Sequence, residues 1–274
     1  MDEFFAQRTL GALLEALGPL GNDINTPQLA IVRILIECIH AHMKEPAMTE
    51  NLAACLPSLM HMTTKLLYTT THAMQLMRET DKADVSALVR AHIGLLALLE
   101  ALHLSAMHAQ ETAFVSMHLV QDMRTSTMID ALVELLRQAR AFMPPKPPFA
   151  PAQSSASKTP VPDQHVPSAL HTNMPNDDRP GLPYLKRTAL QLMGTLAFHA
   201  PGTPWADVHA FQNRIRETGG LYEVLSLTAL DELNPCTYPH AVYTYTQMQI
   251  FTCLHLHNTR RYSRACHLRT PQFA

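Results

Sequence analysis

FQNRIRETGGLYEVLSL (211–227), followed closely by DELNP (231–235), is the stretch that decides the fold of this chain. A charged helix end leads into Gly219 and Gly220, which can adopt the positive φ that closes a helix. An apolar face restarts at once with Leu221. We therefore predict two helices that cross sharply at the double glycine, with at least one glycine at positive φ, as in an armadillo-type repeat.

The pattern extends over about 50 residues. It comprises YLKR (184–187), Leu190, LMGTL (192–196), QNRIRETGGL (212–221) and DELNP (231–235). In order, spacing and chemistry it resembles the C-terminal domain of the ataxin-10 family. The candidate protein-binding or motif residues are Gln212, Asn213, Arg214, Arg216, Glu217, Gly219, Gly220, Asn234 and Pro235.

The resemblance implies an armadillo-like helical solenoid that acts by associating with other proteins and carries no catalytic residues. Larger members of the family are linked with cytokinesis and cell growth. The expected function is therefore a scaffold or adaptor that binds proteins through its solenoid surface and needs no cofactor. The resemblance does not identify the partner.

Residues 1–143 show apolar recurrence of helical period and no convincing strand pattern. One helix is expected to start near Pro57, and another to open at Asp84. Six or so helices at this spacing predict an all-α fold, an armadillo- or HEAT-like right-handed solenoid, although no clean internal repeat sets its period.

Four segments follow from these patterns. Residues 1–143 are predicted to be N-terminal armadillo-like helices, and 184–235 the ataxin-10-type helical domain. Between them, 144–183 holds eleven prolines, which predict a disordered insertion that can loop out of one continuous solenoid. Residues 236–274 are predicted to be a divergent tail.

The tail departs from the family pattern directly after Pro235. It contains no Asp or Glu, and VYTYT (242–246) is β-rich and fits a capping helix badly. Two interpretations stay open: the tail is a read-through or divergent splice form, or it is a poorly ordered native segment. Under both interpretations the tail is predicted to cover the apolar face of 221–227 incompletely, and the exposed face would favour self-association. The residues of this face are Leu221, Val224, Leu225 and Leu227.

Composition excludes several classes of protein. The chain has 274 residues, 47% of them hydrophobic, and a net charge of -2, so no global field favours nucleic acid. The N-terminus, MDEFF (1–5), is acidic where a secretory signal would be basic. No apolar run is expected to approach the roughly 18 residues of a membrane span, so we predict a cytoplasmic protein without membrane insertion.

Candidate chemistry is sparse. Met60, His61 and Met62, with His40, His42 and Met43, suggest copper handling as the alternative function, although adjacent helical residues point in different directions. The cysteines and histidines of 236–274 lack the paired spacing of a zinc site. The sequence contains no phosphate loop, nucleophile elbow or HExxH pattern, so we expect no enzyme.

Overall fold

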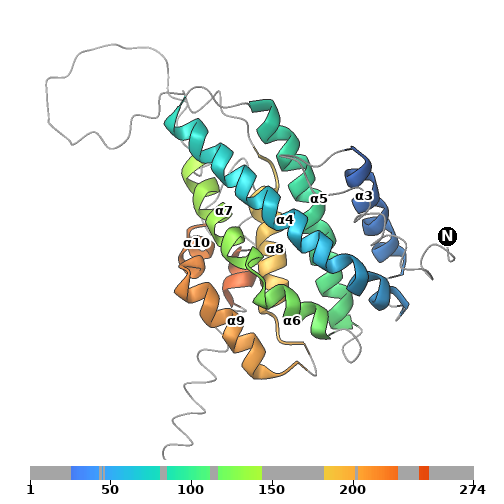
Figure 1. Ribbon diagram of the computed structural model, residues 1–274. Coiled ribbons are helices and arrows are strands. Elements are labelled where there is room, and N and C mark those ends of the chain that lie inside the picture. Colours follow the sequence, from blue (N-terminus) through green and yellow to red (C-terminus); the bar gives the residue numbers. More distant parts are fainter. Residues whose placement is uncertain are drawn as a thin grey trace, which may run out of the picture.

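The computed structural model describes residues 26–42, 45, 47–80, 85–111, 117–143, 182–200, 203–227 and 241–246. Within these residues every regular element is a helix (Figure 1). The helices are α3 (Thr26–Ala41), α4 (Ala47–Glu79), α5 (Val85–Glu111), α6 (Met117–Thr125), α7 (Met128–Phe142), α8 (Leu185–Ala197), α9 (Trp205–Glu217) and α10 (Gly220–Ser226), and a further helical turn spans 241–246. The all-α prediction is confirmed for this part of the chain.

Among the described helices, several contacts join a helix to the third helix after it in the chain. α4 lies against α7 and α7 against α10, which gives one row of helices, and α5 lies against α8, which gives a second row. Figure 1 shows α7 and then α10 succeeding α4 toward one side of the molecule. The turn 241–246 extends the row of α5 and α8, because the Thr244 hydroxyl donates a hydrogen bond of 3.0 Å to the Leu190 carbonyl.

α5 lies at the centre of this packing, between α3, α4 and α8. One window of 18 residues within it has a mean hydropathy of 1.7, so by length and composition α5 could cross a membrane. The prediction that no apolar run approaches this length is therefore wrong for α5. Half of the window is buried among the other helices, as in the core helix of a globular domain.

Pro57 lies inside α4 and does not begin it, which corrects the predicted helix start. A proline in a helix interior costs about 3 kcal/mol, because one backbone hydrogen bond is lost. Cys55, Leu56 and Leu59 beside it are at most 2% exposed, and each such burial contributes about 1.5–3 kcal/mol. Core packing on both sides of Pro57 therefore outweighs the local cost, while the proline itself faces solvent.

The residues that flank 144–181 lie in contact with each other. The Leu182 backbone N–H lies 3.3 Å from the Met143 sulfur, and the Lys186 ammonium donates a 2.8 Å hydrogen bond to the Met143 carbonyl. Lys186 is fully buried, and its charge lies at the C-terminal end of α7, where the helix dipole favours a cation. α7 and α8 thus join directly across the proline-rich segment, which itself lies outside the described residues.

Part of the predicted tail is helical. Residues 241–246 include the VYTYT run, so the expectation that this run resists a helix is wrong. Ala241 and Thr244 are fully buried, and a Cβ on Gly194 of α8 would lie 2.7 Å from the Thr244 hydroxyl oxygen. Because Gly194 has no side chain, the turn 241–246 can approach α8 closely. The burial of Ala241 and Thr244 there outweighs the β-propensity of the VYTYT run. Residues 236–240 and 247–274 lie outside the described residues.

The apolar face of α10 is better covered than the sequence predicts. Val224 is fully buried and Leu227 is 5% exposed, while Leu221 packs partly buried against the core. Leu225 remains 40% exposed, as does Tyr222 beside it at 61%. The predicted incomplete cover therefore applies to Leu225 and is wrong for Val224 and Leu227.

His92 fixes the start of α8 to α5. Its Nε2 donates a 3.1 Å hydrogen bond to the Pro183 carbonyl, and the side chain is buried between the two helices. Burial lowers the pKa of His92 below its ordinary value near 6.5, and the hydrogen bond to Pro183 opposes this shift in part. The folded state therefore holds His92 neutral.

We expect this histidine to make stability depend on pH. Because its pKa is lower in the folded than in the unfolded chain, its contribution is complete above about pH 6.5 and is lost as the pH falls below that value. The free energy of unfolding, measured with urea, should fall more between about pH 7.5 and about pH 5.5 for the wild type than for His92→Gln. Equal losses would show that His92 does not carry the dependence.

Candidate protein-binding site

The motif residue Arg214 connects α9 to the start of α7. Its guanidinium donates two hydrogen bonds to the Asp130 carboxylate, at 3.0 and 2.7 Å, and a third of 3.1 Å to the Arg124 carbonyl. Gln212 is fully buried and donates a 3.3 Å hydrogen bond to the Ala197 carbonyl at the end of α8. Both motif side chains thus hold helices together, Gln212 in the interior and Arg214 at the surface.

Arg124 anchors the same region from α6. Its guanidinium donates hydrogen bonds of 2.8 and 2.9 Å to the carbonyls of Leu196 and Phe198, at the C-terminal end of α8. Burial lowers the pKa of Arg124 to about 10, against the opposing effect of the Asp207 carboxylate. The side chain therefore stays charged at neutral pH and caps the α8 carbonyls that have no partner within the helix.

The double glycine forms the predicted corner between α9 and α10. Gly219 has φ of 80°, which a side chain with a Cβ resists, so this prediction is confirmed. Gly220 is needed for a different reason: a Cβ there would lie 2.8 Å from Val133 of α7 and 3.1 Å from the Ile215 carbonyl. One glycine turns the chain, and the other lets α10 approach α7.

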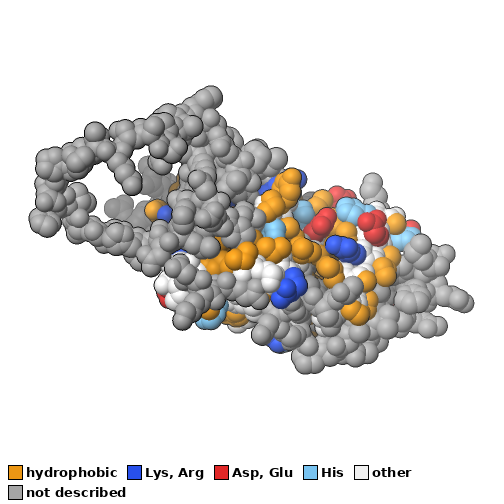
Figure 2. Space-filling view, turned by 90° about the horizontal axis from the view of Figure 1, so that it is seen from above, with side chains coloured by type: hydrophobic (Ala, Val, Ile, Leu, Met, Phe, Trp, Pro, Cys, Tyr) orange, Lys and Arg blue, Asp and Glu red, His pale blue; other side chains and the backbone are white. Residues whose placement is uncertain are grey.

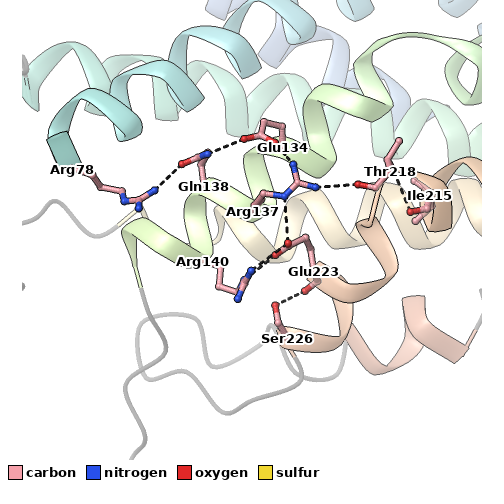
Figure 3. A network of polar contacts seen from close by, with 9 residues as sticks. All are labelled: Arg78, Glu134, Arg137, Gln138, Arg140, Ile215, Thr218, Glu223 and Ser226. Carbon is pink, nitrogen blue, oxygen red and sulfur yellow. Dashed lines mark hydrogen bonds and ion pairs between the residues drawn. The ribbon is translucent and has the colours of Figure 1, made fainter. Parts of the chain in front are cut away.

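A buried carboxylate then fixes α10 to α7. Glu223 has a side chain that is 4% exposed, and it accepts hydrogen bonds of 2.8 and 3.3 Å from Arg140 (Figure 3). Arg137 lies 3.5 Å from the same carboxylate and also donates to the Thr218 carbonyl at 3.0 Å. The pairing raises the pKa of Arg140, chiefly through its hydrogen bond to Glu223.

This network continues along α7 to α4. Arg137 pairs with Glu134, whose other oxygen accepts a 2.8 Å hydrogen bond from Gln138. Gln138 in turn accepts a 3.0 Å hydrogen bond from Arg78 near the end of α4, and Figure 3 shows the chain of contacts from Arg78 to Glu223. Polar side chains thus link α4, α7 and α10 to one another.

The remaining motif residues do not converge on a pocket. Asn213 and Glu217 are exposed on α9, and Arg216 donates a hydrogen bond to Asn213 on the same helix. Asn234 and Pro235 lie outside the described residues. The motif therefore assembles a structural corner, and its outward residues supply only a polar surface.

A different surface has the shape of a binding site. It is a groove between α5 and α8 with a cavity volume of about 410 Å³. The groove is lined by Leu96, Glu100, His103, Leu104, Tyr184, Arg187, Thr188 and Gln191. We call this surface the α5/α8 groove.

An apolar strip on α5 leads into the α5/α8 groove. It consists of Val85, Val89 and Ile93, which are 39%, 38% and 44% exposed, and of the half-buried Leu96. We call these four residues the α5 strip. We did not identify it from the sequence, because an exposed strip of apolar residues on a largely apolar helix reads as core-facing.

The structure describes His40, His42, Met60, His61 and Met62 among the residues suggested for copper. Met62 is 5% exposed in the core, Met60 packs partly buried beside it, and His61 between them is exposed. His42 pairs with Glu45 at 3.0 Å. The described residues bring together no group of three or more His, Cys, Asp or Glu side chains able to hold a metal ion, and Met43 lies outside them.

Comparisons with protein-family models, with curated proteins and with solved structures found no match for this chain. The ataxin-10 resemblance therefore stays a prediction that depends on the motif residues themselves.

We expect the two glycines of the corner to respond differently to substitution. Gly219→Val should cost about 1–3 kcal/mol of stability, and Gly219→Asn clearly less, because asparagine tolerates positive φ. Gly220→Ala should cost about 1–3 kcal/mol through overpacking against Val133. Urea unfolding measures all three, and equal losses for the valine and asparagine variants at position 219 would contradict the backbone explanation.

Removing the charge of Glu223 should loosen α10 from α7. We expect Glu223→Gln to cost about 1–2 kcal/mol, less than for a fully buried pair because both arginine side chains reach solvent. Glu217→Gln, on the exposed side of α9, is the matched control and should leave the melting temperature unchanged. Equal melting temperatures for both variants would show that the network contributes no stability.

Proposed function

We propose that this chain is a non-catalytic scaffold that binds other proteins, an armadillo-like solenoid related to the ataxin-10 family. The recurrence of packing every third helix supports the architecture, since armadillo units contain three helices each. The corner at Gly219 supports it further, because the last helix of one unit must turn sharply against the unit before it. We propose a cytoplasmic location and a role connected with cell growth or division on the family resemblance alone.

The observation that carries the binding function is the α5 strip. Val85, Val89 and Ile93 follow one another at helical spacing, each more than a third exposed. Figure 2 shows that hydrophobic side chains gather in a band on one face of the described surface, with charged side chains beside it. Contiguous exposed apolar surface of this kind marks a protein-binding site more often than scattered single residues do.

The binding surface can be tested by affinity purification from cells. The double variant Val89→Glu with Ile93→Glu places two charges on the α5 strip, and Tyr68→Glu on α4 is the control at another exposed apolar residue. We expect the set of proteins recovered with the wild type to be retained by the control and lost, by about tenfold or more, with the double variant.

Circular-dichroism melting of both variants ensures that the comparison concerns binding. If the double variant melts like the wild type and recovers the same proteins, the α5 strip is not the binding surface and the proposed function is wrong at this site.

A further inference from the structure

Arg187, which lines the α5/α8 groove, is a cation without a partner. It lies in the first turn of α8, which contains no acidic residue. Lys186 beside it is buried and donates to the Met143 carbonyl. Arg187 is half-buried, and within the described residues its guanidinium forms no ion pair or hydrogen bond. The Arg187 side of the groove therefore favours an anion.

An anion without a partner lines the same groove from α5. Glu100 is exposed, and in the part of the chain that the structure describes its carboxylate has no hydrogen bond or ion pair. The Gln191 side-chain amide, which also lines the groove, is likewise unbonded among the described residues. The groove thus offers a cation, an anion and an amide that can both donate and accept a hydrogen bond.

α5 and α8 run in the same direction and stay in step along their contact. His92 bonds to Pro183 just before α8 begins, and the His103 Nδ1 lies 3.0 Å from the Thr195 hydroxyl near the end of α8. Almost equal stretches of the two helices separate these two bonds. Positions on α5 can therefore be assigned to positions at the same level on α8.

This alignment sets how far apart the two charges lie along the groove. Arg187 lies level with Leu96, and Glu100 lies level with Gln191. The four residues from Leu96 to Glu100 correspond to about 6 Å along the helix axis. Side chains on both helices lean toward the N-terminus, so the two charged groups keep this offset.

Tyr184 lines the groove just before α8 begins and has a strained backbone. Its φ is 65°, a conformation that a residue with a Cβ adopts at a cost in free energy. Strain of this kind collects at ligand sites more often than elsewhere. The cavity of about 410 Å³ lies within the usual size range of small-molecule sites, so the groove has room for a small polar ligand.

We propose that the α5/α8 groove binds a free dipeptide or another small zwitterion of that length, which goes beyond the proposed scaffold function. The ligand carboxylate pairs with Arg187, and its ammonium group pairs with Glu100. Two extended residues span about 7 Å, close to the offset of the two charges, whereas a single amino acid spans about 3.5 Å. The Gln191 amide bonds to the peptide group between the two charged ends.

The probe is alanyl-alanine, and three related molecules test each part of the recognition. These are its N-acetyl form, which lacks the ammonium charge, its C-terminal amide, which lacks the carboxylate, and free alanine, which is too short. NMR titration of the isotope-labelled intact chain gives each dissociation constant. We expect alanyl-alanine to bind at least about threefold to tenfold more tightly than each of the other three.

Substitutions assign each ligand group to its residue. Arg187→Gln should abolish the preference for alanyl-alanine over its amide, and Arg187→Lys, which keeps the charge, should retain it. Glu100→Gln should abolish the preference over the N-acetyl form and leave the preference over the amide intact. Glu217→Gln, exposed on α9, is the control and should change none of the dissociation constants.

The ligand series on the wild type tests the proposal even if a variant fails to fold. Absence of alanyl-alanine binding would overturn it, as would equal binding of the dipeptide, its amide and its N-acetyl form. Preferences that survive in both Arg187→Gln and Glu100→Gln would show that the ligand binds outside the groove. None of these measurements involves the proteins recovered by affinity purification, so failure here leaves the proposed scaffold function standing.

Discussion

The burial of α5 is the constraint on which the rest of the described structure depends. A helix that is apolar over most of its circumference must be covered by its neighbours, and α5 is covered by α3, α4 and α8. These helices in turn place α7 against α4 and the turn 241–246 against α8. Only one side of α5 stays open, and the α5 strip lies there.

Polar side chains make this apolar packing specific. Arg124, Lys186 and Gln212 all donate to carbonyls at the ends of α7 or α8, where the helices have no internal partner for them. The Glu223 carboxylate instead fixes the contact of α10 with α7 by accepting hydrogen bonds from Arg140 and pairing with Arg137. These groups fix which helix end meets which, and apolar burial supplies most of the free energy.

The motif and the proposed binding surface are separate features. Arg214 and Gly220 hold α9 and α10 against α7, so these motif residues form a structural corner. The α5/α8 groove lies on other helices, and polar side chains make up most of its lining. A resemblance based on the motif thus bears on the fold.

The sequence by itself determined the helical class and the corner at Gly219, because helical periodicity and glycine conformation are local properties. Tertiary packing decided the local structure at two places where sequence rules predict it wrongly. Pro57 stays inside α4, and VYTYT (242–246) becomes helical against Gly194, because burial outweighs local propensity. It also decided that Val85, Val89 and Ile93 stay exposed, since exposure depends on which neighbouring helices cover a side and not on local periodicity.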